Sequence, residues 1–527
     1  MPHRTAHSVS LSPRRLTATA LAATLAMLIA GCAVGPDYQR PSVTVPASFK
    51  EAPEGWKVAQ PADQSDRGTW WTIYNDTRLD ALETQLNQSN QTVTQYAAAY
   101  RQARALVGEA RAAYFPTIGA SASGSRSGTG AGNRSTSSSS FGQQGSVNNQ
   151  FSASLDASWE PDLWGTVSRT VASQKAGQQG AAADLANARL SAQATLAQTY
   201  YQLRSLDAQQ RLLDDTVAAY GQSLKLTQNQ YGQGIVARSD VIQAQTQLQS
   251  AQAAAIDNGV TRAQYEHAIA VLVGEPASTF SIPPIPLDAT PPTVPVQMPS
   301  AMLERRPDIA SAERKAAAAN EQIGVEMAAY FPTLTLSAQG GFESSVLSQL
   351  LRAPSRFWTL GPDIAATLFD GGLRSARTDA ARAAYDQNVA TYRQTVLTAF
   401  QDVEDNLASL RILEKEIAVQ QQAVESAQQA LAIINNQYKA GTVAYINVLT
   451  AQTTAFTAQQ KLANIAGQRM VSSVGLVKAL GGGWDTAQMD HETGDVQAPA
   501  AASATSATSA ASAPMAKTAD ASHTTER

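Results

Sequence analysis

The chain of 527 residues has a single cysteine and only five histidines. Four of those histidines lie near the two ends of the chain, which leaves His267 alone in the folded body. These counts exclude a Cys/His zinc site, a disulfide framework and a Cys–His nucleophile. Aromatic residues make up 6%, charged residues 16%, and the net charge is −4, so a basic face with stacking rings for nucleic acid is also missing. An enzyme would have to rely on carboxylates or serine alone, and no spacing of these residues recommends one.

Proline is absent from Asp162 to Glu275 and from Asp363 to Ala498. Both runs are rich in Ala, Gln, Leu and Arg, which are good helix formers, and both are interrupted by glycine, near Gly232–Gly234 and near Gly441. We expect each run to form two helical arms of roughly sixty residues, about 90 Å long at 1.5 Å per residue. Arms of this length must pack lengthwise against other helices, as coiled coils do.

The chain contains an internal duplication. The segment around Tyr231 recurs around Tyr438, 207 residues later, and the Ala-Tyr-Phe-Pro-Thr segment at Tyr114 recurs at Tyr330, 216 residues later. Each unit reads as helix, strand hairpin and long helical hairpin. The expected division is a signal peptide at 1–31, an N-terminal segment at 32–80, a first repeat at 81–280, a Pro-rich linker at 281–300, a second repeat at 301–484 and a disordered tail at 485–527.

The amino terminus indicates export. Arg4, Arg14 and Arg15 precede an apolar stretch, Leu16–Ala30, that is too short to span a bilayer and ends at Gly31-Cys32. Small residues directly before a cysteine resemble a bacterial lipobox, in which cleavage leaves Cys32 as an acylated amino terminus. The alternative is an ordinary signal peptide with an incidental cysteine. The lipid on Cys32 is the only non-protein group that we expect, with no cofactor and no metal.

Four segments alternate between apolar and polar residues, the first of them more weakly than the others. Phe151, Leu155 and Trp159 interleave with serines and with Asp156 and Glu160. The same pattern occurs at Thr117–Ser123, at Thr333–Phe342 and at Trp358–Leu368, where Asp363 is on the polar side. About ten residues with one apolar face is the pattern of a transmembrane β-strand, and we expect Asp156, Glu160 and Asp363 to face the lumen or the base of a barrel. The alternative is an amphipathic sheet that covers a soluble core.

Four strands cannot close a barrel, and an open sheet edge is not tolerated in hydrocarbon. Because the smallest single-chain barrels use about eight strands, the barrel must be shared between copies of the chain. This reasoning leaves a dimer or a trimer.

Several motifs, in order and partly duplicated, resemble one family. They are Gly31-Cys32-Ala33-Val34-Gly35-Pro36-Asp37-Tyr38, Trp70-Trp71 followed by Asp76, Tyr114-Phe115-Pro116, Leu163-Trp164-Gly165, Leu303-Glu304-Arg305-Arg306-Pro307-Asp308-Ile309, Leu368-Phe369-Asp370-Gly371-Gly372 and the two glycine turns. They are similar to those of the TolC-like outer-membrane efflux proteins, and in particular to the lipidated, NodT-type branch that serves resistance-nodulation-division pumps. Within that branch, Ala33 after the lipidated cysteine implies the outer membrane.

This resemblance implies a membrane α+β fold: a homotrimer with a twelve-stranded transmembrane β-barrel, continued by a long periplasmic α-helical barrel with coiled-coil hairpins. It implies a lipid-anchored protein of the cell outer membrane. The helical tips would meet a periplasmic adaptor (membrane fusion) protein that links them to an inner-membrane resistance-nodulation-division pump. The role would be a passive exit duct for drugs or other small molecules, with no enzymatic activity and no nucleic-acid partner.

The resemblance also implies roles for residues at the tip of the helical hairpins. Asp240 and Tyr438 match positions that hold the tip shut. Asn447 and Thr450 match positions where some members carry a ring of aspartates, and Val443 stands where an arginine latch is sometimes found. Residues of the turns that we expect to contact the adaptor are Gly232, Gly234, Val236, Gly441 and Val443. The three glycines are also interpreted as turn residues that need unusual φ angles.

The sequence leaves two rival functions open. One is the exit channel of a type I protein-secretion system, against which the lipobox and the Leu303–Ile309 segment favour the efflux branch. The other is a structural, trimeric coiled-coil protein at the cell surface. It would explain the long helices but not the duplicated strand hairpins.

Overall fold

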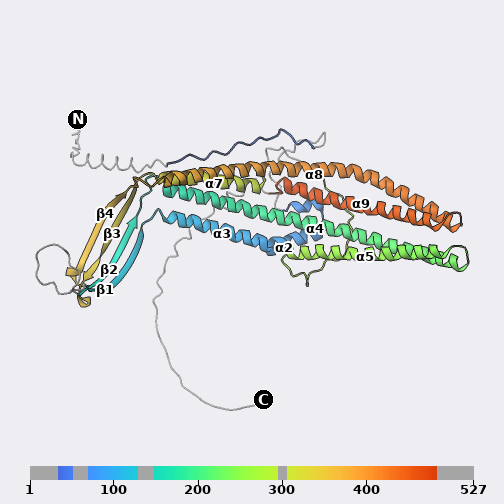
Figure 1. The fold of residues 1–527 in the computed structure, drawn as a ribbon, viewed down its shortest axis with the longest axis horizontal. Coiled ribbons are helices and arrows are strands. Elements are labelled where there is room, and N and C mark those ends of the chain that lie inside the picture. Colours follow the sequence, from blue (N-terminus) through green and yellow to red (C-terminus); the bar gives the residue numbers. More distant parts are fainter. Residues whose placement is uncertain (1–33, 52–68, 129–146, 293, 295–304, 484–527) are drawn as a thin grey trace, which may run out of the picture.

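The computed structural model describes residues 34–51, 69–128, 147–292, 294 and 305–483. The molecule is a long rod with a small sheet at one end and two helical hairpins at the other (Figure 1). The signal peptide, Cys32 and the tail from residue 485 lie outside the described residues. The elements of the first unit are α3 (Gln91–Ala112), β1 (Thr117–Gly128), β2 (Val147–Trp159), α4 (Thr166–Gly232) and α5 (Arg238–Leu272).

The second unit repeats the first, element by element. Its elements are α7 (Pro307–Ala328), β3 (Thr333–Ser344), β4 (Arg356–Ala365), α8 (Leu373–Lys439) and α9 (Tyr445–Ala479). Corresponding helices have equal lengths: 22 residues in α3 and α7, 67 in α4 and α8, and 35 in α5 and α9. The difference between the two repeat spacings falls in the strand hairpins, because residues 113–165 outnumber residues 329–372 by nine. The duplication is therefore structural as well as sequential.

The prediction of two arms of roughly sixty residues is wrong. The first arm of each hairpin has 67 residues, about 100 Å, and the second has 35, about 52 Å at 1.5 Å per residue. The shorter α3 and α7 lie alongside the sheet-proximal parts of α4 and α8, so the returning arms α5 and α9 cover only the remaining length (Figure 1). The hairpins are therefore unequal coiled coils, each completed by a shorter helix.

The four strands form one antiparallel sheet in the order β1-β2-β3-β4. In the register, Leu155 lies opposite Ala120 and Gly340, and Gly340 lies opposite Trp358, so these residues share one face. That face carries large exposed apolar side chains, namely Ile118, Leu155, Trp358, Leu360 and Ile364. The predicted alternation is confirmed.

The predicted fourth strand is too long at its end. β4 stops at Ala365, and Leu368 is exposed in the turn before α8. The Asp370 carboxylate accepts hydrogen bonds from the Gly372 and Arg374 backbone N–H groups, which starts the helix and ends the extended chain. The hairpin between β3 and β4 holds two short 3₁₀ turns, η3 (Leu347–Gln349) and η4 (Ala353–Ser355).

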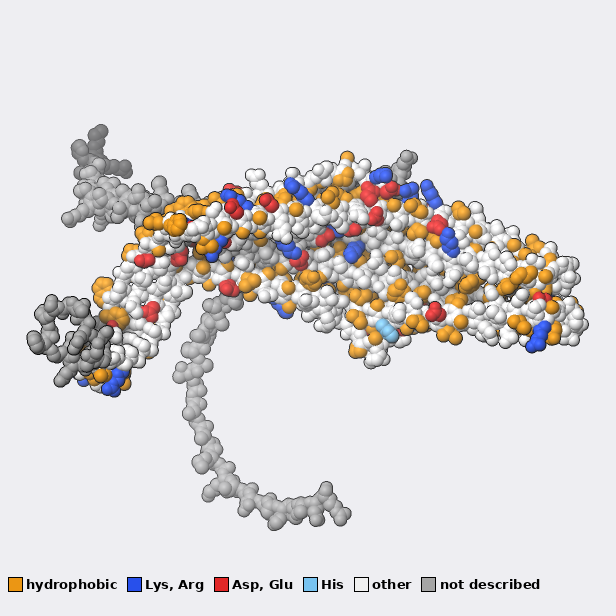
Figure 2. Space-filling model, in the orientation of Figure 1, with side chains coloured by type: hydrophobic (Ala, Val, Ile, Leu, Met, Phe, Trp, Pro, Cys, Tyr) orange, Lys and Arg blue, Asp and Glu red, His pale blue; other side chains and the backbone are white. Residues whose placement is uncertain are grey.

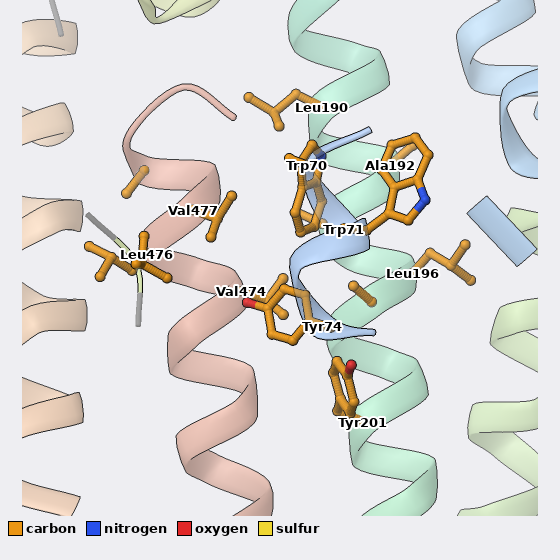
Figure 3. Close-up of a cluster of buried hydrophobic side chains, with 14 of the residues drawn as sticks. Trp70, Trp71, Tyr74, Leu190, Ala192, Leu196, Tyr201, Val474, Leu476 and Val477 are labelled. Carbon is orange, nitrogen blue, oxygen red and sulfur yellow. The ribbon is translucent and has the colours of Figure 1, made fainter. Parts of the chain in front are cut away.

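The main core lies where the amino-terminal region crosses the helical wall. The 3₁₀ helix η1 (Trp70–Tyr74) inserts its aromatic side chains between α4 and α9 (Figure 3). The following helix α2 (Thr77–Ser89) begins at Asp76, whose side chain accepts from the Arg78 and Leu79 N–H groups and also pairs with Arg204 at 2.5 Å. The Trp70-Trp71 motif therefore joins the two units through their helices.

The Arg306-Pro307-Asp308 segment starts α7, with Pro307 in the first turn as predicted. Arg306 does more than start a helix: it is buried, pairs with Asp308 at 2.6 Å and with Asp402 at 3.2 Å, and donates to the Ala479 carbonyl at 3.0 Å. It thus ties α7 to α8 and α9. Among the described helices, none is both long enough and apolar enough to cross a membrane.

Candidate functional sites

The two hairpin tips, which form the far end of the rod from the sheet, are built alike. In each tip an N–H group bonds the carbonyl five residues earlier: Ile235 to Gln230 at 2.9 Å, and Thr442 to Gln437 at 3.0 Å. Gly234 and Gly441 both have φ = +74°, a conformation that favours glycine, so the turn interpretation is confirmed for them.

For Gly232 the prediction of an unusual φ is wrong. It is the last residue of α4 and lacks a positive φ, because the chain leaves the helix two residues later. Gly232 is exposed, whereas Val236 and Val443, on the turns, are partly buried. A contact between these turns and an adaptor stays a prediction.

Tyr438 joins the two hairpins of one chain at the tip. Its side chain is 3% exposed and packs with Tyr445, Ala244 and Val448, which come from α9 and α5. The Tyr438 and Tyr445 ring centroids are 5.6 Å apart. The Tyr438 hydroxyl lies 3.2 Å from the Thr227 hydroxyl of α4. Sequence reasoning missed Thr227, because no local pattern connects it to Tyr438, 211 positions away. It also missed Tyr445, which packs in the same cluster as Ala244 of the other hairpin.

Asp240 lies in the first turn of α5 and is partly buried. Burial raises the pKa of Tyr438, the negative charge of Asp240 adds to this, and the hydrogen bond with Thr227 acts the other way. Asp240 therefore lies close enough to Tyr438 for its negative charge to act on the tyrosine hydroxyl. Asn447 and Thr450 are exposed on α9, and the Thr450 hydroxyl donates to its own helix at the Ile446 carbonyl.

The predicted polar face of the sheet exists. Asp156 lies opposite Gly119 and Gln339. Asp363 lies opposite Thr335, four residues from Gln339 on β3, so the two carboxylates share a face. Glu160, four residues beyond Asp156 and just past the end of β2, continues the same side. The orientation of this face toward a lumen stays a prediction.

An amino-terminal strap, residues 34–51, runs along the helices and begins at the sheet. The Val34 N–H donates to the Trp164 carbonyl at 3.1 Å, and Trp164 stacks on Phe331 with centroids 4.8 Å apart. Arg169, at the start of α4, donates to the Val34 and Gly35 carbonyls at 3.3 and 3.2 Å. The start of the strap is therefore held at the junction of sheet and helices.

The strap stays attached farther along. The Tyr38 hydroxyl donates to the Glu313 carboxylate at 2.6 Å, and the Lys50 N–H donates to Glu404 at 2.7 Å. Phe49 is buried with its ring 6.5 Å from that of Phe400. In the described part of the chain, no three His, Cys, Asp or Glu side chains come together as metal ligands.

The sequence matches the outer membrane efflux protein family over residues 82–275 and 298–482, which correspond to the two repeats. It is 31% identical to "Probable efflux pump outer membrane protein TtgC" of Pseudomonas putida, over 88% of this chain and 95% of the relative. It is 31% identical to "Pyoverdine export outer membrane protein OpmQ" of Pseudomonas aeruginosa, over 82% of this chain and 92% of that protein.

The fold is similar to that of solved outer-membrane channels. The structure of the outer-membrane channel OprN superposes with a TM-score of 0.77 at 27% identity, covering 86% of this chain and all of OprN. The predicted arrangement of a strand segment continued by a long helical tunnel is thereby confirmed. The chain belongs to the outer membrane efflux protein family.

Proposed function

We propose that this chain is the outer-membrane exit duct of a tripartite efflux pump and passively conducts small molecules from a periplasmic adaptor and an inner-membrane resistance-nodulation-division pump to the cell exterior. The observation that carries this is a sheet with one apolar and one polar face, continued by a helical wall, in a member of the efflux family. The relatives' names refer to efflux and export of quite different compounds, so they supply no cargo for this chain. No described feature favours protein secretion, a surface coiled coil or an enzyme.

The duct requires three copies of the chain in this proposal. β1 and β4 are the two edges of the sheet, and three sheets joined edge to edge give twelve strands. The helices support the same assembly. α7 packs between α4 and α8 of its own chain, whereas α3, its counterpart in the first unit, packs chiefly on α4. The free side of α3 therefore matches a helix α8 from another copy.

In the sheet-proximal part of the rod, α7 packs on a surface of α4. The equivalent surface of α8 forms an open groove. The groove, about 560 Å³, is lined by Gln387, Ala390, Thr391, Gln394, Thr395, Thr398 and Asp308. The 207-residue spacing of α4 and α8 makes Ala390 equivalent to Ala183, which is fully buried in a cluster with Ala310 of α7. Ala390 is exposed in the single chain. The duplication thus supports seating α3 of the next copy in this groove.

Lipidation of Cys32 belongs to the proposal and is supported by the position of the strap. Val34, two residues after Cys32, is hydrogen-bonded beside the Trp164 and Phe331 rings at the end of the sheet. Aromatic rings of this kind gather at membrane interfaces, so an acyl chain on Cys32 would enter the bilayer close to the level where the barrel leaves it. The lipid is the only covalent group in the proposal.

We expect Cys32→Ser to lose all acylation, because it removes the only thiol, and to reduce delivery to the outer membrane. Metabolic labelling with a palmitate analogue, followed by membrane fractionation, measures both. Cys32→Ala, which also lacks the thiol but carries no hydroxyl, is the matched control and should behave alike. Normal lipid labelling of either variant would refute the lipobox interpretation.

Planar-bilayer conductance tests the duct and its tip together. We expect the wild-type protein to conduct weakly with a closed tip, and Asp240→Ala combined with Tyr438→Phe to conduct several-fold more, because the link between α4 and α8 is lost. Tyr220→Phe is the control. Tyr220 is buried like Tyr438 but lies on α4, and its hydroxyl interacts with Gln247 of α5, in the same hairpin. Unchanged conductance in the double variant would remove the assignment of Asp240 and Tyr438 to the gate.

A further inference from the structure

The helical tip carries an excess of positive charge. Within residues 216–256 the charged side chains are Lys225, Arg238 and Asp240, and within residues 426–460 Lys439 stands alone. The next charges along the helices are Asp215, Asp257, Glu425 and Lys461, about 20 residues from the turns and so roughly 30 Å away at 1.5 Å per residue. Three bases against one acid give a net charge of +2 for the tip of each chain, although the chain as a whole is at −4. On the face drawn in Figure 2, charged side chains crowd the middle of the rod and are sparse toward the tip.

The charges of these three basic side chains are not neutralised by ion pairs among the described residues. Arg238 and Lys439 are exposed, and within the described residues neither forms an ion pair, nor does Lys225. Asp240 is partly buried in the first turn of α5, where the helix amino terminus attracts its negative charge. Lys439 lies in the last turn of α8, where the carboxyl end of the helix attracts its positive charge in the same way, so this effect does not favour either sign. The fully exposed charges of the tip are basic.

The helix dipoles do not change the net positive charge of the tip. The carboxyl ends of α4 and α8 and the amino ends of α5 and α9 meet at the tip, so their opposite helix dipoles largely cancel. The positions where an acidic ring would stand hold the uncharged Asn447 and Thr450. The side chains of Arg238, Lys439 and Lys225 therefore set the sign of the local potential.

The sheet at the other end has the opposite sign. Its polar face holds Asp156, Asp363 and Glu343, with Glu160 just beyond β2, and the register places no basic residue on that face. A wide, water-filled barrel screens such charges over about 8 Å at physiological salt. Charges act most strongly on a passing ion at the narrowest point, where low-dielectric walls concentrate the field.

We propose that the tip is an electropositive entrance that favours anionic solutes, such as carboxylates and sulfonates, over cations. This rests on the proposed function, because three copies would bring three such tips together around one opening and give a local charge of +6. Arg238 and Lys439 are the residues that determine the preference. The tip would select solutes by charge alone, and the pump would recognise individual compounds.

The test is the reversal potential of the purified full-length trimer in planar bilayers under a tenfold KCl gradient. We expect chloride to be more permeant than potassium in the wild type. Lys439→Glu should lower the chloride-to-potassium permeability ratio at least about twofold, and Arg238→Glu with Lys439→Glu should bring it below one. Lys439→Gln should fall between the wild type and Lys439→Glu, since it removes a charge without reversing it.

Lys415→Glu is the matched control. Lys415 is exposed on the same helix, 24 residues from Lys439, which is about 36 Å at 1.5 Å per residue and several screening lengths away. The chloride-to-potassium permeability ratio of Lys415→Glu should equal that of the wild type. A conducting wild-type channel that prefers potassium, or a ratio unmoved by the double charge reversal, would overturn the anion preference alone. An assembled trimer without any conductance would overturn the proposed function and the preference with it.

Discussion

Cysteines introduced together at Thr94 and Ala390 are expected to cross-link the chain into covalent trimers. Ala310 of α7 packs with Ala183 of α4, and the repeat spacings of 216 and 207 residues carry this pair to Thr94 of α3 and Ala390 of α8. Both residues are exposed in the single chain, so the contact forms only between copies. Helices packed through small residues bring Cβ atoms within the roughly 3.5–4.5 Å that a disulfide needs.

Non-reducing gel electrophoresis of isolated membranes would measure the cross-link. The matched control is the pair Ala183→Cys and Ala310→Cys, which should form a disulfide within one chain and leave its mass unchanged. Each single cysteine should give at most dimers. The native Cys32 adds no free thiol where it is acylated. Only monomers from the Thr94 and Ala390 pair, under conditions where the control pair oxidises, would contradict the seating of α3 on a neighbouring α8.

Gly274→Ala is expected to destabilise the protein far more than Gly441→Ala, although both glycines end a helix at φ = +74°. A Cβ atom at Gly274 would lie 2.5 Å from the Ser89 carbonyl oxygen, whereas at Gly441 nothing lies within 4 Å. At the exposed site the added Cβ atom costs only the strain of holding an alanine in the left-handed region, about 1–2 kcal/mol, and the packed site adds a backbone clash, for a total of roughly 2–5 kcal/mol.

Thermal unfolding of the detergent-solubilised protein, followed by circular dichroism, compares the two variants. Gly481→Ala provides a second packed case, because its Cβ atom would clash with the Arg305 carbonyl oxygen. Gly274→Ala and Gly481→Ala should therefore both unfold at clearly lower temperatures than Gly441→Ala. Equal losses at all three sites would show that backbone conformation, not close packing, is the reason for these glycines.

The strand pattern shows how much local sequence can predict. The alternation at Phe151–Glu160 identifies β2 and its apolar face because side chains on a strand point to opposite sides with a period of two. The same pattern failed to locate the end of β4, since alternation continues to Leu368 while Asp370 already starts the next helix. The hydrogen bonds that the Asp370 carboxylate accepts from backbone N–H groups decided that boundary.

The candidate tip site was predicted only in part. Tyr438 and Asp240 were identified by resemblance, and the structure places them near each other, but Thr227 and Tyr445 became visible only in three dimensions. Likewise, the Arg305-Arg306-Pro307 motif predicts a helix start, whereas the link from Arg306 to Asp402 and Ala479 depends on packing across the chain. Contacts between residues about 100 or more positions apart leave no periodic signal.

The sequence by itself determined the duplication, the helix-rich composition, the four amphipathic strands and most of the glycine stops. These features follow from backbone preferences and side-chain periodicity, which act over a few neighbouring residues. The tertiary structure alone decided the different surroundings of α3 and α7, two helices of equal length in equivalent positions. Which faces meet depends on how the whole chain buries its apolar surface, and that is settled only when distant segments pack together.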